Sequence, residues 1–413
     1  MSFASNELRR LAWICWGLLA VPGVAAAETK QPVGAVTNPP VDAFNPWGSE
    51  PAPSFNPWEG GVGTEQLARG DSPCGNCDTD WCNVNYGRGY EGLPLPAWTD
   101  LPPWYAGADA LFLVRDNSED ITIASIGPQG AEALTTEDFD YELRPGIRLT
   151  LGRTINDNFR IEASYLGQHS WDDTVTVRNL NANALGGLGN LFSPFSGFGN
   201  PVGVPGLDFN NRVTIDETSE LDSAEIDLRY RAPVRCGAFE TILLCGVRYV
   251  RVDESFGYFS QSSVTAPIAS TNLINVETSN DLVGGQIGGN VIYRASERWW
   301  INTDAKAGVF GNAARQNTVY TRADAQGGSS TITGEAQEGG TALVGEVKIE
   351  SCYQLFPRLT IVAGYQAMWI DGLALGTNNL QRDFNILTLG PAEVDHNGTS
   401  VYHGPHAGVV WSW

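Results

Sequence analysis

The chain has 413 residues, which is long enough to bury a sizeable core, but its composition differs from that of most soluble domains. Only 17% of its residues are charged, whereas 42% are hydrophobic and 47 are glycine. The formal net charge of -22 at pH 7 disfavours a nucleic-acid partner, because phosphates would be repelled.

Residues 1–27 have the pattern of a secretory signal peptide. Arg9 and Arg10 precede an apolar stretch from Leu11 to Val24, and three alanines stand before Glu28. The apolar stretch is shorter than the roughly 20 residues that a membrane-spanning helix needs. We therefore expect cleavage and export from the cytoplasm.

Residues 28–98 differ from the rest of the chain. They are rich in proline and glycine, they show no strand or helix periodicity, and they repeat Phe-Asn-Pro-Trp at 44–47 and 55–58. We interpret them as a periplasmic leader that precedes a barrel domain at 99–413. The repeats fit either a recognition motif or an aromatic linker that docks on its own barrel.

Beyond the leader, polar and apolar residues alternate with a period of two. In residues 143–151, Leu, Pro, Ile, Leu and Leu at odd positions alternate with Arg, Gly, Arg and Thr, and residues 159–165 repeat the pattern. A soluble β-sandwich also alternates in this way. A β-sandwich does not, however, require short and long connections to alternate regularly, as they do in this chain.

The pattern predicts an all-β fold, an antiparallel transmembrane β-barrel of about ten strands, within a range of eight to twelve. The connections after strands two, four, six and eight are short, whereas those after the odd strands run some 25 to 50 residues, as in outer-membrane barrels. The ten predicted strands are 104–115, 141–152, 158–167, 221–231, 241–252, 282–294, 299–310, 341–351, 358–369 and 400–413.

If the apolar face of each strand contacts lipid, the other face lines the lumen. Charges of both signs in a narrow space are expected to pair, because an unpaired buried charge is costly. We interpret this lumen charge network as structural. Its predicted members are Asp109, Glu142, Arg144, Arg148, Arg160, Glu162, Glu225, Asp227, Arg229, Arg248, Arg294, Asp304, Lys306, Glu346, Lys348 and Glu350.

The last strand carries the most specific local pattern. His406, Gly408, Trp411 and Trp413 fit polar-x-Gly-x-x-aromatic-x-aromatic, the pattern that closes outer-membrane barrels and is read by the barrel assembly machinery. Both tryptophans fall on the face that is predicted to contact lipid, near an interfacial aromatic girdle.

The cysteines are candidates for disulfides rather than for a metal site. An oxidising compartment favours disulfides, so the candidates for pairing are Cys74, Cys77, Cys82, Cys236 and Cys352, whereas Cys245 is expected inside a strand. The CxxC at 74–77 has no second ligand pair, which argues against zinc. We therefore expect neither a metal nor a cofactor.

Asp395 and His396 lie in the last long loop and invite comparison with barrel proteases that carry an acid and a histidine at the outer rim. The following Asn-Gly is more typical of a turn, and no nucleophile or paired carboxylate accompanies them. We do not expect an enzyme.

The strand residues resemble the outer-membrane β-barrel proteins that are expanded in Planctomycetes. The resemblance covers about 104–413 and implies an outer-membrane barrel, without catalytic or binding residues to carry over. It rests on residues 104–113 (WYAGADALFL), 245–249 (CGVRY) and 280–289, which contain Gly-Gly-Gln at 284–286.

We therefore expect an integral outer-membrane barrel with a structural or surface-interaction role and long acidic extracellular loops. Its expected partners are outer-membrane lipid, the barrel assembly machinery and an envelope or surface partner. A narrow porin-like channel is the first alternative, and a hydrolase at the outer rim is the second.

Overall fold

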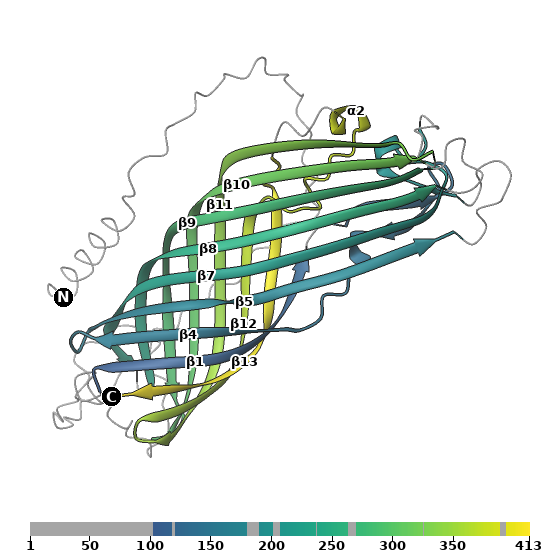
Figure 1. Cartoon of the computed structure of the whole chain (residues 1–413). Coiled ribbons are helices and arrows are strands. Elements are labelled where there is room, and N and C mark those ends of the chain that lie inside the picture. Colours follow the sequence, from purple (N-terminus) through teal and green to yellow (C-terminus); the bar gives the residue numbers. More distant parts are fainter. Residues whose placement is uncertain are drawn as a thin grey trace, which may run out of the picture. The chain divides into compact units, whose positions relative to one another are not determined.

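The computed structural model describes residues 102–117, 120–179, 190–200, 207–236, 238–262, 270–324, 326–388 and 394–413. Most of these residues are in long β-strands (Figure 1). The predicted signal peptide, the leader and its two aromatic repeats lie outside the described residues.

Ten strands form a closed antiparallel ring, as the alternation predicts. β1 pairs with both β4 and β13, and β7 pairs with both β5 and β8, so the ring has no open edge. The ring strands are β1 (Trp104–Asn117), β4 (Arg144–Thr154), β5 (Phe159–Arg178), β7 (Asn210–Cys236), β8 (Phe239–Ser262), β9 (Ser270–Arg294), β10 (Trp299–Asp324), β11 (Ser329–Phe356), β12 (Leu359–Leu373) and β13 (Gly398–Ser412).

Short elements lie between the ring strands, and several of them pack inside the ring. β2 (Thr122–Ile126) pairs with β3 (Ala131–Thr135) and with β6 (Leu191–Phe192). Two 3-10 turns follow β3 and β6, and the short helix α2 (Phe384–Leu387) lies between β12 and β13. No described helix is long and apolar enough to cross a membrane.

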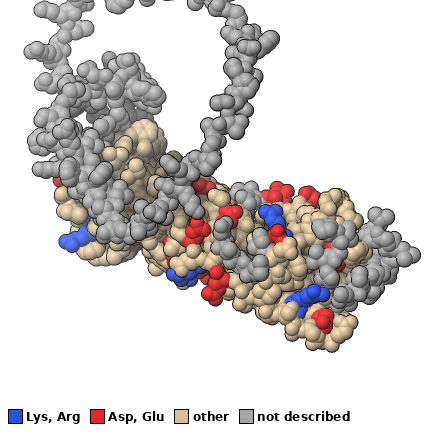
Figure 2. All heavy atoms as spheres, turned by 90° about the horizontal axis from the view of Figure 1, so that it is seen from above, with Lys and Arg blue, Asp and Glu red and all other residues tan. Residues whose placement is uncertain are grey.

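The outer surface of the ring carries a belt of apolar side chains. Aromatic residues stand near its two ends, with Trp299, Tyr353 and Trp411 towards the short turns and Tyr165 and Tyr249 towards the other side. Charged side chains are sparse on the face shown in Figure 2. The belt includes Leu149, Leu151, Ile161, Ile226, Val283, Ile287, Val291, Val309, Leu343, Val347, Ile349, Ile361 and Val409.

An apolar belt bounded by aromatic residues is the surface that a transmembrane barrel presents to lipid. The connections on one side are short, as predicted: β9 ends at Arg294 and β10 begins at Trp299, and β11 ends at Phe356 and β12 begins at Leu359. In barrels of this kind the short turns face the periplasm. The opposite end of the barrel therefore faces outwards.

The strands run much farther outwards than the sequence pattern predicts. β7 to β11 have 24 to 28 residues each, so residues that we expected in long loops continue the sheet instead. We call this part the outer extension: residues 168–178, 210–221, 251–262, 270–281, 311–324 and 329–341. Twelve residues at about 3.3 Å each give it a length of roughly 40 Å along a strand.

The polarity of the two sheet faces reverses where the outer extension begins. On β9, Val283, Ile287 and Val291 point outwards within the belt, whereas Ile274 and Val276 are buried inside the extension. The predicted strand boundaries were wrong for this reason. They assumed an apolar face that points outwards, and such a face exists only where the strand contacts lipid.

Candidate functional site

The lower half of the lumen holds the predicted charge network. Arg229 on β7 contacts Glu162 at 2.7 Å and Asp304 at 2.9 Å, which joins β5, β7 and β10 across the interior. Lys306 contacts Glu225 at 2.5 Å and Asp227 at 3.3 Å. Because the members pair with one another, the network neutralises its own charges inside the barrel.

A second part of the network connects more distant strands. Arg248 on β8 contacts Glu346 on β11 at 2.7 Å, and Arg148 on β4 reaches the same carboxylate at 3.5 Å. Lys348 contacts Glu350 at 2.9 Å. These side chains are nearly all buried, so the lower lumen is filled by ion pairs between facing walls.

Some predicted members lie apart from this cluster. Glu142 is exposed and precedes β4, and Arg144 pairs with the exposed Asp172 at 3.0 Å, so neither belongs to the lower lumen. Both lie at the outer end of β4. The predicted strand began at residue 141, whereas β4 begins at Arg144. Arg160 and Arg294 lie towards the short turns, where they stack over the rings of Tyr105 and Trp300.

Neutral polar side chains complete the network, and sequence reasoning missed them. The Tyr105 hydroxyl donates to Glu162 at 2.6 Å, and the Gln286 amide donates to Glu225 and Asp227 at 2.8 and 2.7 Å. Asn302 donates to Glu350 at 2.7 Å. A search restricted to charged residues could not find them, although they share the inward face with their partners.

The residues of the last-strand pattern lie as their spacing predicts. Trp411 and Trp413 are 48% and 46% exposed on the lipid side, whereas His406 is buried with its Nε2 3.8 Å from Glu350. A Cβ atom on Gly408 would overlap Oδ1 of Asp109, so this position requires glycine. Recognition by the assembly machinery stays a prediction.

A layer of buried apolar side chains lies in the lumen above the network. We call it the inner apolar layer, and side chains from β1, β5 and β7 to β13 meet in it. Leu111, Leu113 and Trp171 are all 0% exposed. The layer consists of Leu111, Leu113, Leu166, Trp171, Leu221, Val250, Val252, Leu282, Phe310, Ala342, Val344, Met368, Ile370, Leu373, Leu375 and Tyr402.

A buried polar cluster follows outside this layer. Arg115 on β1 contacts Glu217 on β7 at 2.8 Å and also binds Glu254 on β8. The Tyr141 hydroxyl donates to Glu217, and the backbone N–H of Gly376 donates to Glu254 at 2.9 Å. Burial, opposed in part by Arg115, raises the pKa of Glu254 to about 7.

The interior of the outer extension is filled by a second apolar layer, the outer apolar layer. Ile123 and Leu134 come from the connection between β1 and β4, and they share this cluster with Phe195, Leu207 and Leu380 from other connections. The extension contributes Val213, Ile215, Phe256, Tyr258, Ile274, Val276 and Tyr320. Two apolar layers therefore stand between the charge network and the outside.

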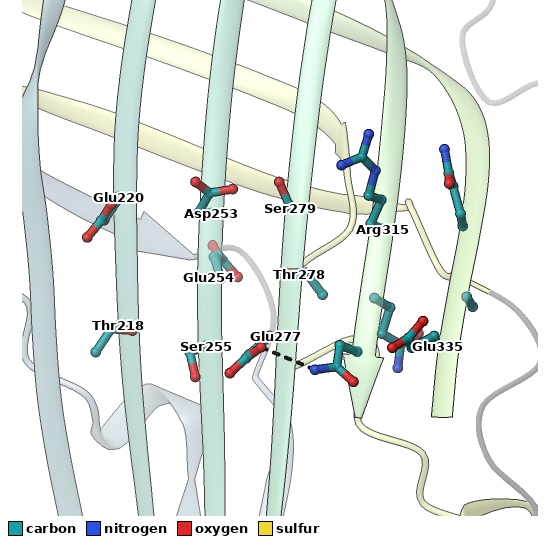
Figure 3. Close-up of a pocket in the computed structure, with 14 residues that line it drawn as sticks. Thr218, Glu220, Asp253, Glu254, Ser255, Glu277, Thr278, Ser279, Arg315 and Glu335 are labelled. Atoms are coloured by element: carbon teal, nitrogen blue, oxygen red, sulfur yellow. Dashed lines mark hydrogen bonds between the residues drawn. The ribbon is translucent and has the colours of Figure 1, made fainter. Parts of the chain in front are cut away.

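The outer face of the extension carries a hollow of about 740 Å³, which we call the outer groove (Figure 3). Strand register places two rows of polar side chains across β7 to β11 in it. The first row consists of Glu220, Asp253, Ser279, Arg315 and Gln337. The second row consists of Thr218, Ser255, Glu277, Asn317 and Glu335.

The outer groove has an acidic balance. Four carboxylates belong to the two rows, and Arg315 is the basic member. Glu277 accepts hydrogen bonds from Asn275 at 3.1 Å and from Asn317 at 3.3 Å, the second of which is the dashed line in Figure 3. The groove therefore offers fixed carboxylates and amides to solvent.

The Asp395–His396 pair is built into a turn. The carboxylate of Asp395 accepts from the backbone N–H of Asn397 at 2.9 Å and from its side-chain amide at 2.7 Å, which is ordinary turn chemistry. His396 has its Nε2 3.9 Å from Glu338 on β11. Within the described ranges, Asp395 therefore stabilises its own turn, whereas His396 lies beside another strand.

The cysteine predictions are tested only in part. Cys352 has a free, buried thiol, so the expected disulfide at this position is not formed. Cys352 lies within β11 and not in a short turn, as the disulfide prediction assumed. Cys245 is buried in β8, as expected, but it is disulfide-bonded, although it was not among the predicted candidates for pairing. Cys74, Cys77, Cys82 and the side chain of Cys236 lie outside what the structure describes. Among the described residues, no group of His, Cys, Asp and Glu could hold a metal ion.

The sequence model of one protein family, "Putative beta barrel porin-7 (BBP7)", matches residues 101–400. The chain belongs to this family. Its match begins just before β1 and ends within β13, so it covers nearly the whole ring. None of the curated proteins matches the chain.

The solved structures that match the chain include outer-membrane proteins at low sequence identity. The outer membrane protease OmpT from Escherichia coli is 11% identical, with a TM-score of 0.36, 75% of this chain covered and 97% of that chain. A major outer membrane protein from Thermus thermophilus is 13% identical, with a TM-score of 0.26 and coverages of 75% and 98%. The Pseudomonas putida toluene transporter TodX is 10% identical, with a TM-score of 0.31 and coverages of 75% and 89%.

Together, the family and the closed ring place the chain among porin-like proteins of the outer membrane. The predicted fold and location are thereby confirmed. The resemblance is confirmed as one to a family of β-barrel porins, whereas the link to Planctomycetes stays a prediction.

Proposed function

We propose that this BBP7 protein is a sealed outer-membrane barrel that acts through its outer surface, as a surface-interaction protein. The inner apolar layer carries the proposal. Its side chains come from strands all around the ring and are buried against one another, so they block the axis of the barrel. Hydrated ions and polar solutes have no favourable path through such a layer.

The size of the ring supports a filled interior. Barrels of about eight strands are filled by side chains, whereas water-filled porins use about 16 to 18. Ten strands are near the lower limit, and both the charge network and the two apolar layers occupy the space. The outer extension is then the largest part of the protein that is available to a partner.

The outer groove is the face that we assign to contact with a partner. Its four carboxylates favour a partner that presents basic groups, because opposite charges attract across a partly solvated surface. Exposed charges interact over about 10 Å at 0.1 M salt. Binding should therefore weaken as salt is raised.

Binding to a lysine- and arginine-rich peptide tests this assignment. A glutamate-rich peptide of equal length serves as the opposite probe, and both are measured by fluorescence anisotropy with the folded full chain. The triple variant Glu220→Gln, Asp253→Asn, Glu277→Gln should weaken binding, whereas Glu297→Gln in the periplasmic turn should leave it unchanged. Equal binding of both peptides would contradict the assignment.

A narrow channel is the alternative, and the porin description of the family favours it. It needs the inner apolar layer to move aside, so that the charge network below becomes the filter. Conductance across a planar lipid bilayer separates the two functions, because only an open channel gives discrete current steps.

A further inference from the structure

A second hollow lies on the belt, outside the lumen and within the membrane region. We call it the lipid-facing groove. It has a volume of about 480 Å³ and spans β4, β5, β7, β8 and β9. Its lining is predominantly apolar, with Leu149, Leu151, Ile226, Val247 and Val283 among the residues that surround it.

Strand register explains why this part of the belt is hollow. Tyr165, Ala224 and Tyr249 are directly paired neighbours on β5, β7 and β8, and all three point outwards. Two large rings therefore flank a methyl group, at two strand spacings or about 10 Å from each other. Ala163 lies in the adjacent row, so the hollow continues along the barrel.

The two tyrosines connect the lipid-facing groove to charged residues at its outer end. The Tyr165 hydroxyl donates to Asp222 at 2.6 Å, and the Tyr249 hydroxyl donates to Asp281 at 2.6 Å. These contacts place the carboxylates immediately beyond the aromatic edge of the belt. Lipid headgroups lie at this level, because tyrosine rings favour the membrane interface.

The charges at the outer end alternate in sign. Arg251 on β8 stands in register between Asp222 on β7 and Asp281 on β9. It also donates from Nε to Asp253 at 2.7 Å, with half of its side chain exposed. A row of acid, base and acid can meet a headgroup that carries both signs.

We propose that the lipid-facing groove holds one acyl chain of an outer-leaflet phospholipid whose headgroup carries a primary ammonium group. The chain lies between Tyr165 and Tyr249 over Ala224. The ammonium group donates to Asp222 or Asp281, and the phosphate accepts from Arg251.

The chemistry of the row selects this class of lipid. A purely anionic headgroup would meet Asp222, Asp253 and Asp281 with Arg251 as the one base in the row, so repulsion would exceed attraction. A quaternary ammonium group has no N–H to donate to the carboxylates. The inference does not rest on the sealed lumen, because the groove faces lipid.

Retention of lipid by the full-length folded protein tests the acyl-chain part. The protein is reconstituted into vesicles of equal parts phosphatidylethanolamine and phosphatidylglycerol with identical chains, extracted in mild detergent and examined by native mass spectrometry. Ala224→Leu fills the space between the tyrosines, and we expect it to reduce the retained lipid about tenfold, which corresponds to about 1.4 kcal/mol.

Ala363→Leu is the matched control, because Ala363 is an exposed alanine on β12 away from the lipid-facing groove. It should retain lipid as the parent does. Both variants must first show the same heat-dependent shift in gel mobility as the parent, which confirms folding. Equal loss in both variants, or no lipid retained by the parent, would overturn the proposal.

The headgroup part has its own readout. We expect the parent to retain phosphatidylethanolamine several times more than phosphatidylglycerol, and Asp222→Asn with Asp281→Asn to bring the ratio close to one. Glu297→Gln in the periplasmic turn should leave the ratio unchanged. A parent ratio near one would show that the groove does not select an ammonium headgroup.

Discussion

Arg115 on β1 contacts Glu217 on β7 at 2.8 Å across the interior of the barrel, although β4 and β5 separate the two strands in the ring. The same guanidinium group binds Glu254 on β8. One fully buried arginine thus connects β1 with β7 and β8 through the interior, at the point where the barrel leaves the membrane.

Replacing Arg115 should weaken the outer extension strongly. Arg115→Leu leaves two carboxylates buried without their cation, and removal of one partner from a buried ion pair costs about 3–5 kcal/mol. Hydrogen exchange of β7 and β8 residues 210–221 and 251–262 measures the effect. Arg315→Leu, at an exposed arginine in the outer groove, should change stability by less than about 0.5 kcal/mol.

A rescue distinguishes charge from packing at the same site. Adding Glu217→Gln and Glu254→Gln to Arg115→Leu removes the uncompensated charges, so protection should return in part. If the triple variant is as unprotected as the single one, the loss is due to packing and the ion-pair explanation is wrong.

The outer extension should lose stability as pH rises through neutrality. The pKa of Glu254 is raised by burial from its ordinary value of 4.5 to about 7, so the folded state holds a proton that the unfolded state releases at lower pH. This contribution is fully present below about pH 4.5 and is lost as pH rises through about 7. In hydrogen exchange, Glu254→Gln should make the stability of the outer extension less dependent on pH. If the pH dependence is unchanged, another group causes it.

The inner apolar layer should respond to truncation as a packed core does. Phe310 is 2% exposed and stands in contact range of Gly284 and Gly308. Phe310→Ala should cost about 3–5 kcal/mol in urea unfolding, because it leaves a cavity. Val309→Ala, at the neighbouring exposed position in the belt, is the control and should cost much less.

Barrel closure should depend on the absence of a side chain at Gly408. In Gly408→Ala the new Cβ atom would overlap both the Asp109 carboxylate and the Ala108 carbonyl, so the backbone must shift. The folded fraction after refolding into detergent should fall. Gly339→Ala meets no atom within 4 Å and should refold as the parent does.

Much of this fold could be predicted from the sequence because lipid imposes a simple rule. Within the belt, strands alternate apolar and polar residues, and turns such as 295–298 break the pattern, so the number of strands could be counted. The lumen charges follow from the same alternation, which is why Arg229, Glu162 and Asp304 were expected in one network.

The outer extension could not be predicted by that rule. There the apolar residues, such as Val213 and Ile274, face inwards against the connections that fold into the barrel. Polar and apolar residues still alternate there, but the apolar residues face the interior and the polar residues face outwards. A rule that looks for apolar residues facing lipid therefore mistakes these strands for polar loops. Glu217 and Glu254, the partners of Arg115, were missed because they lie beyond the predicted strands 221–231 and 241–252, in residues that we expected to form loops.

Conductance across a planar lipid bilayer tests the sealed lumen most directly. The folded protein is inserted, and insertion is verified by protection of the belt strands from protease. We expect no discrete current steps for the parent, because the inner apolar layer blocks the axis. Reproducible steps that disappear when Arg148 or Lys306 is neutralised would contradict the sealed lumen and identify a narrow channel that uses the charge network as its filter.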